Sequence, residues 1–141
     1  MEIQVAAICD SACDYEGKLC LLGAFDTIVT GQVPVSHPQC AVALRLVFRK
    51  EEEGQHSVCV NFVNEDGRSI VPPLETVFDV ELPDNFFFVI RNLILNFHQL
   101  SFAHEGLYAV DVSVDDRLAA SIPLQVRCAH ELTDESPADD L

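Results

Sequence analysis

The sequence of 141 residues contains no tryptophan, one methionine and only eight basic residues. Its 23 acidic side chains give a formal net charge of −15, and such a chain repels nucleic acid phosphates and anionic membrane surfaces. No apolar run reaches the roughly 18 residues that a transmembrane helix needs. We therefore expect neither nucleic acid nor a membrane among the partners.

We also expect no secretory signal, because Met1 to Val5 include neither a basic stretch nor the start of a long apolar stretch. The sequence contains six cysteines. Without export, we expect them to be reduced thiols that pack as small apolar side chains. These features predict a soluble protein located in the cytoplasm.

The clearest pattern lies between residues 106 and 126, where apolar and polar side chains alternate with the period of a β-strand. The two arms each collect their apolar side chains on one face: Tyr108, Val110, Val112 and Val114, then Leu118, Ala120, Ile122, Leu124 and Val126. We expect a β-hairpin with residues 115–117 as its loop. Its predicted pairs are Val114 with Leu118, Val112 with Ala120, and Val110 with Ile122.

Similar patterns recur along the chain and predict eight or nine strands without a helix. They cover residues 3–9, 19–25, 42–48, 58–62, 76–82 and 93–97. Residues 19–25 are apolar on both faces, so we expect a central strand there, with Gly23 at a bulge or close approach. Residues 42–48 and 58–62 should form a hairpin, and residues 30–38, with two prolines, a long connection between sheets.

Strands at this spacing favour an all-β protein, a two-sheet antiparallel β-sandwich of immunoglobulin-like or related Greek-key topology. A jelly roll is the alternative. Tyr108 stands where immunoglobulin-like domains place the tyrosine of their corner. Pro123 lacks a donor for the ladder, so its strand should be at an edge or interrupted. We assign residues 1–128 to the sandwich and residues 129–141 to an acidic disordered tail.

Five segments carry a resemblance to known proteins: Met1–Asp10, Leu22–Asp26, His37–Cys40, Arg91–Asn96 and Gly106–Tyr108. In these segments the chain resembles a family of small bacterial all-β proteins of unknown function, over about residues 1–127. The resemblance implies a bacterial, cytoplasmic β-sandwich. It brings no activity and no catalytic residue with it.

Cysteines and histidines are the first candidates for chemistry. Cys9, Cys13 and Cys20 lie around the first turn, but their spacing is not that of a zinc ribbon, and packing explains them. His37 with Cys40 is the only local pair of a base and a nucleophile, and a three-residue spacing in a loop does not establish the required geometry.

Acidic side chains cluster at residues 10–16 and 115–116, where oxygen ligands for calcium would be expected. Neither cluster follows the alternation of an EF-hand loop, and a chain this acidic forms such clusters by composition. We therefore predict no catalytic residue, no cofactor-binding residue and no metal ligand.

A surface for a partner is the remaining candidate. Six residues on the presumed outer faces of strands combine amide groups, apolar area and little charge, as interface cores do: Asn61, Val63, Asn92, Ile94, Asn96 and His98. If their strands are neighbours, this face could receive a partner. Phe86, Phe87 and Phe88 cannot all face one core, and we expect them to cap the core rather than to form an apolar contact site.

The function predicted from these features is that of a non-enzymatic cytoplasmic interaction module that binds an unknown protein partner or a second copy of the chain. A small metal- or calcium-binding sandwich is the alternative, and a hydrolase the third reading. Retained metal would distinguish the second reading, and a pH-dependent activity the third.

Overall fold

The structure of the protein is a computed structural model that describes residues 1–129. These residues form nine β-strands and a 3₁₀ turn, and no α-helix. Sheet A has the order β2-β1-β4-β7 and consists of β1 (Glu2–Tyr15), β2 (Lys18–Ala24), β4 (Val35–Arg49) and β7 (Phe88–Phe102). Sheet B has the order β3-β9-β8-β5-β6 and consists of β3 (Thr27–Thr30), β5 (Gly54–Val63), β6 (Leu74–Val80), β8 (Gly106–Val114) and β9 (Arg117–Cys128).

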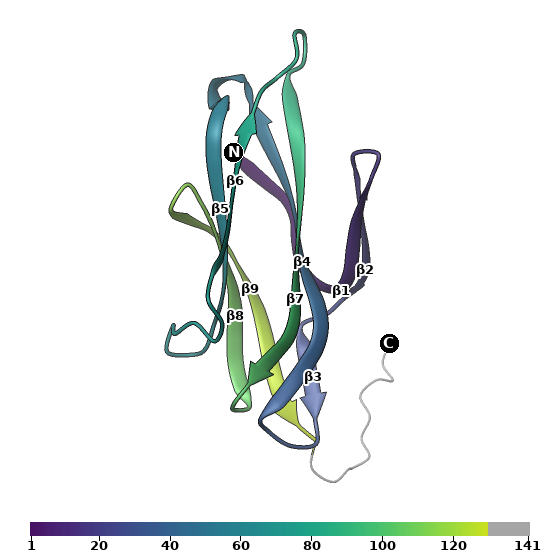
Figure 1. The fold of residues 1–141 in the computed structure, drawn as a ribbon, viewed down its shortest axis with the longest axis vertical. Helices are drawn as coiled ribbons and strands as arrows, with labels where there is room; N and C mark the ends of the chain where they lie inside the picture. The colour runs from purple at the N-terminus through teal and green to yellow at the C-terminus, as the bar shows by residue number, and fades with distance from the viewer. Residues whose placement is uncertain (130–141) are drawn as a thin grey trace.

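The predicted all-β architecture of two sheets is confirmed (Figure 1). The described residues include no helix long and apolar enough to cross a membrane. The expected disordered tail, residues 129–141, lies outside the described range apart from Ala129, whose N–H donates to the carbonyl of Thr30 at 2.8 Å.

The core lies between the two sheets. Strand β4 alternates as predicted and contributes four side chains with no exposed area: Val42, Leu44, Leu46 and Phe48. Buried residues of β5 and β8 belong to the same cluster: Val58, Val60, Phe62, Val110, Val112 and Val114. Burying each of these side chains stabilises the fold by about 1.5–3 kcal/mol. These side chains on the inner faces of β4, β5 and β8 are therefore what joins the sheets.

The β8–β9 hairpin forms where it was predicted, with one change of register. Val110 pairs with Ile122 and Val112 with Ala120, as expected. The predicted pair of Val114 with Leu118 is wrong, because the register shifts after Val112 and Val114 pairs with Arg117. The turn contains only Asp115 and Asp116, both with positive φ, as two-residue hairpin turns of type I′ require.

Tyr108 closes one end of this hairpin as predicted. Its hydroxyl donates to the carbonyl oxygen of His104 at 2.6 Å, and its ring meets Phe102 edge to face with centroids 5.0 Å apart. A tyrosine that bonds to the backbone just upstream is the contact expected of a tyrosine corner. The immunoglobulin-like topology itself stays a prediction. Pro123 lies where β9 has no partner on its β3 side, because β3 pairs only from Gln125 onward.

Two expectations about connections are wrong. Residues 42–48 and 58–62 do not pair, because the 3₁₀ turn at Lys50–Glu52 carries the chain from sheet A to sheet B. The long connection at residues 30–38 is shorter, since β4 begins at Val35 and includes Pro38. The short strand β3 pairs in parallel with β9, whereas the other strand pairs of the two sheets are antiparallel.

The prediction that residues 19–25 form a central strand is wrong. Strand β2 is the edge strand of sheet A. Strand β1 pairs with β4 only up to Cys9 and then continues with β2 as a hairpin, which we call the flap (residues 10–24). The flap lies on the side of β4 and β7 that faces away from sheet B (Figure 1). Its Ala12 and Leu19 pack, together with Ile94, on a small cluster of buried residues formed by Cys9, Ala41 and Ala43. The apolar inner side of β2 thus covers a second, smaller core.

Gly23 marks the bend of the flap, at the close approach expected from the sequence. Its φ is +71°, a conformation that favours glycine, and a Cβ atom there would lie 2.4 Å from the carboxylate of Asp10. The hairpin can therefore fold back only with a glycine at this position or with a displaced Asp10.

Candidate functional site

Three consecutive phenylalanines lie in the loop between β6 and β7, which we call the aromatic loop (residues 81–88). Phe86 is 58% exposed, Phe87 88% and Phe88 48%. The loop projects at the top end of the molecule, past the ends of the neighbouring strands (Figure 1). The expectation that these residues cap the core is therefore wrong.

The base of the aromatic loop is held in place, which sets the direction of its tip. Leu82 is buried, and its N–H donates to the carboxylate of Glu53 at 2.7 Å. The N–H of Phe86 donates to the carbonyl of Pro83 at 3.2 Å and closes a turn in which Asn85 has a φ of +72°. Because the turn is anchored by Leu82, the phenylalanines that follow it point out of the sandwich.

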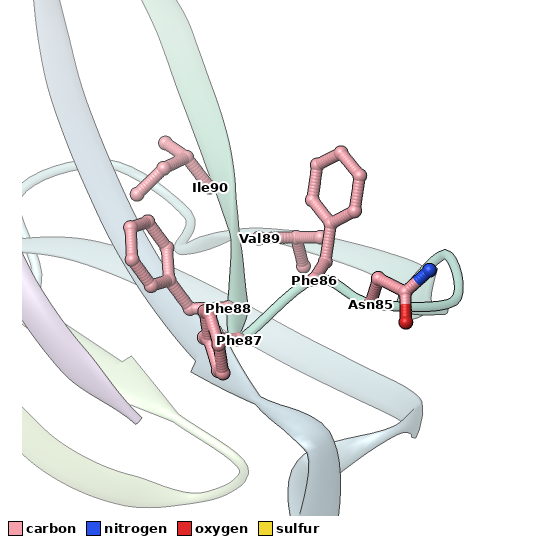
Figure 2. Close-up of a pocket in the computed structure, with 6 residues that line it drawn as sticks. All are labelled: Asn85, Phe86, Phe87, Phe88, Val89 and Ile90. Carbon is pink, nitrogen blue, oxygen red and sulfur yellow. The ribbon is translucent and has the colours of Figure 1, made fainter.

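The aromatic side chains surround an open hollow. Phe88 and Ile90 project to one side of β7, and Phe86 and Val89 to the other (Figure 2). Residues 85–90 line a concavity of about 520 Å³. None of these six residues carries a charge. The hollow can receive apolar groups, and the side chains that line it include no titratable acid or base.

Two basic side chains near the base of the loop are paired with carboxylates. Arg49, the register partner of Phe88, lies 3.1 Å from Glu2, and the amino group of Lys50 lies 3.2 Å from Glu53. The hydrogen bond from Leu82 and the contact with Lys50 hold the pKa of Glu53 below its ordinary value. The loop thus combines an apolar tip with two acidic residues of its own, Glu81 and Asp84.

The predicted interaction face does not form one surface. Asn61 and Val63 lie on β5 in sheet B, whereas Asn92, Ile94, Asn96 and His98 lie on β7 in sheet A. Asn61 accepts a hydrogen bond from Ser69, and Val63 is 7% exposed. A joint patch requires that β5 and β7 be neighbouring strands, and they lie in different sheets.

Two of the β7 residues are occupied by the flap. The side-chain amide of Asn92 donates to the carboxylate of Asp14 at 2.9 Å and to the carbonyl of Gly17 at 3.2 Å. The bond from Asn92 is the largest cause that holds the pKa of Asp14 below its ordinary value. Ile94 packs beneath the flap, whereas Asn96 and His98 are exposed. Only these last two remain available for a partner.

Among the cysteines, Cys9 is buried, whereas Cys13 and Cys20 are exposed and lie directly opposite each other in the flap. The three do not come together as a metal site. Across residues 1–129, no three side chains of His, Cys, Asp or Glu gather as metal ligands.

His37 and Cys40 do not provide an activated nucleophile. Cys40 is buried in the core, and burial raises the pKa of its thiol to about 11. The thiol is therefore protonated at neutral pH and a poor nucleophile. The Nε2 atom of His37 is buried and has no hydrogen-bond partner, and its ring lies 5.5 Å from that of Phe25.

The acidic clusters serve local structure. Asp14 accepts from the N–H of Gly17 within the flap turn at 2.9 Å. Asp115 accepts from the N–H of Ser57 at 2.9 Å and lies 2.7 Å from the ring of His56, which ties the β8–β9 turn to β5. These bonds from His56 and Ser57 outweigh desolvation and lower the pKa of Asp115.

Residues 4–127 match the model of a family of unknown function, DUF6941. The chain belongs to this family. The match covers most of the sequence and agrees with the resemblance drawn from the sequence segments. The family has no assigned function, and a bacterial origin stays a prediction.

No curated protein matches the sequence. One similar solved structure is the Pseudomonas fluorescens alkylpurine DNA glycosylase AlkC bound to DNA containing an abasic site analog, with a TM-score of 0.46 and 12% identity. The similarity covers 89% of this chain and 30% of the glycosylase chain, so this DUF6941 chain spans less than a third of that protein's length. At this TM-score the likeness carries no inference about DNA or activity.

Two features of this DUF6941 protein were missed from the sequence. The exposure of the aromatic loop was missed because three adjacent phenylalanines are compatible with both capping and projection. The opposition of Cys13 and Cys20 was also missed, although the signal was present. A two-residue turn at Glu16 and Gly17 pairs Tyr15 with Lys18, and counting two positions outward pairs the cysteines.

Proposed function

We propose that this protein is a non-enzymatic interaction module that binds a protein partner through the aromatic loop. The observation that carries the proposal is the exposure of Phe87, whose side chain is 88% accessible at the tip of an anchored loop. Aromatic side chains supply much of the binding energy of protein interfaces, and exposed apolar patches mark such sites.

The anchoring of the loop supports a binding role rather than incidental exposure. Leu82 and the turn at Pro83 hold the base of the loop, so that the phenylalanines are presented in advance of binding. A loop that is already ordered loses less conformational entropy when a partner binds. The hollow lined by residues 85–90 would accept an apolar side chain of the partner in return.

The negative net charge of the chain favours a different protein, rather than a second copy of this chain, as the partner of the aromatic loop. Each chain carries a net charge of −15, and two copies that meet at their tips would repel each other. The same charge opposes an anionic membrane. We infer a partner that presents an apolar recess and a neutral or basic rim, where the acidic body of the module adds attraction.

Photo-crosslinking in living cells tests whether a protein partner binds the aromatic loop. A photo-crosslinking amino acid replaces Phe87. The matched control carries it in place of Leu118, which is 64% exposed beside the β8–β9 turn. We expect a polypeptide crosslinked from position 87 and not from position 118. The purified partner should then bind Phe87→Ser at least about 10-fold more weakly than the original chain, as loss of an interface anchor predicts, and Leu118→Ser unchanged.

The other results would reject the proposal. Crosslinks to a second copy of the chain would show a homomeric contact, and crosslinks to lipid would show a membrane contact. Equal crosslinking from positions 87 and 118, or none from position 87, would show that the loop binds no protein selectively.

A further inference from the structure

The flap holds two cysteines at a distance that a disulfide can bridge. Cys13 on β1 and Cys20 on β2 are direct partners in the antiparallel register. Opposed residues in such a ladder have Cα atoms about 4.5–5.5 Å apart, within the range of about 4.4–6.8 Å found in disulfides. Direct partners also project from the same face of a ladder, so the two thiols share one side of the flap.

That side of the flap faces solvent. Ala12 and Leu19, the sequence neighbours of the two cysteines, pack inward on the small core under the flap. Because side chains alternate along a strand, Cys13 and Cys20 project outward, and both are exposed. Small thiol reagents can reach them without opening the fold.

The two thiols also interact with each other. The pKa of Cys13 is raised, first by partial desolvation and then by the charge and hydrogen bonding of Cys20. No other two cysteines among the six are register partners. Cys9 and Cys40 are buried, Cys59 faces Glu75 and Ser113, and Cys128 faces Thr30.

We propose that Cys13 and Cys20 form a reversible thiol–disulfide modification site, whose disulfide crosslinks the two strands of the flap. The oxidant is a low-molecular-weight disulfide such as glutathione disulfide. This site does not depend on the aromatic loop, and its test is independent of the proposed function.

The reaction proceeds in two exchanges. The thiolate of one cysteine attacks glutathione disulfide, which forms a mixed disulfide and releases one glutathione thiolate. The thiolate of the other cysteine then attacks the protein sulfur of the mixed disulfide, forms the Cys13–Cys20 bond and releases the second glutathione. Two cysteine thiols are oxidised, one glutathione disulfide is reduced to two thiols, and the two cysteine protons pass to the released thiolates.

The crosslink would act on the contacts that hold the flap. Cys13 and Cys20 bracket residues 14–19, which include Asp14 and Gly17, the residues bound by Asn92. Arg45 also donates to the carbonyl of Gly17, at 3.1 Å. A disulfide at the base of this segment restrains its unpaired conformations and so favours the closed flap. The raised pKa of Cys13 lowers its thiolate fraction at neutral pH, so oxidation should become faster as the pH rises.

The test equilibrates the folded protein in glutathione buffers of graded ratio, blocks the remaining thiols and digests the protein without reduction. Trypsin cleaves after Lys18, so the disulfide links the peptide 1–18 to the peptide 19–45, and fragment ions separate Cys13 from Cys9 and Cys20 from Cys40. We expect two of six thiols to be lost, with one link between Cys13 and Cys20. Cys13→Ser should abolish the link, and the matched control Cys59→Ser should leave it unchanged.

A second probe tests the geometry without oxidation. Phenylarsine oxide bridges two close thiols with loss of one water, and we expect one arsenical per chain in the original protein and in Cys59→Ser, and none in Cys13→Ser. Mixed glutathione disulfides at both positions without a link would overturn the proposal. So would a link through Cys9 or Cys40, or arsenical binding that survives Cys13→Ser.

Discussion

The β8–β9 hairpin and the flap begin with the same local turn and reach different environments. Each turns through two residues of positive φ, Asp115 and Asp116 in the first and Glu16 and Gly17 in the second. The β8–β9 hairpin lies in sheet B with one face in the main core, whereas the flap covers the outer face of sheet A and leaves Leu22 70% exposed. Between these two hairpins, apolar content alone therefore does not identify the strand that packs in the main core.

The comparison predicts its largest effect in the β8–β9 hairpin. Tyr108→Ala removes a ring that is 5% exposed and packs on Phe102, and it should lower the free energy of unfolding by about 3–5 kcal/mol. Tyr108→Phe keeps the ring, loses the bond to His104 and should cost only about 1 kcal/mol. Urea unfolding measures both. A loss below about 1 kcal/mol for the alanine variant would remove Tyr108 from the core.

A substitution at the bend of the flap should lower the free energy of unfolding by less than Tyr108→Ala does, and its effect should stay within the flap. Gly23→Ala places a side chain at a φ of +71° against Asp10, which should cost about 1–2 kcal/mol. Because the flap packs on a separate small core, we expect faster hydrogen exchange at residues 10–24 and unchanged exchange in β8. Equal loss of protection in both hairpins would show that the flap unfolds only together with the whole domain.

The sequence predicted those parts of the fold in which every second side chain of a strand packs into the main core. Strand β4 and the β8–β9 hairpin follow from alternation, and Tyr108 follows from its place at the start of a strand. The hairpin predicted between residues 42–48 and 58–62 failed because a short connection serves equally for pairing within a sheet and for crossing between sheets. That choice depends on long-range contacts that no local pattern encodes.

The candidate site was less accessible to prediction for the same reason. Asn61 and Asn92 were grouped by chemistry, but sheet assignment, which the pattern does not contain, separates them. The exposure of Phe87 depends on where its loop ends relative to the other strands. Register across a two-residue turn, by contrast, is local, and the pair of Cys13 and Cys20 could have been derived from the turn at Gly17.

The contact between the flap and β7 should depend on pH, because Asp14 accepts a hydrogen bond from Asn92. In the folded state the pKa of Asp14 lies below its ordinary value of 3.8, mainly because Asn92 donates to its carboxylate. The stabilisation from this bond is therefore fully present above pH 3.8 and is lost as the pH falls through the lower, folded pKa. We expect the side-chain amide resonance of Asn92 to titrate with a midpoint below 3.8. Asp14→Asn should abolish this titration, and a midpoint above 3.8 would contradict the contact.

The smallest effect is expected on the outer side of the flap. Leu22 is 70% exposed on an edge strand, so Leu22→Ser should change the free energy of unfolding by less than about 0.5 kcal/mol. Leu19, on the same strand, packs on the small core, and Leu19→Ser should cost clearly more in the same urea titration. A cost for Leu22→Ser as large as the one expected for Leu19→Ser would mean that both faces of β2 are covered in solution. A partner, rather than this chain, would then supply the layer over the outer face of this edge strand.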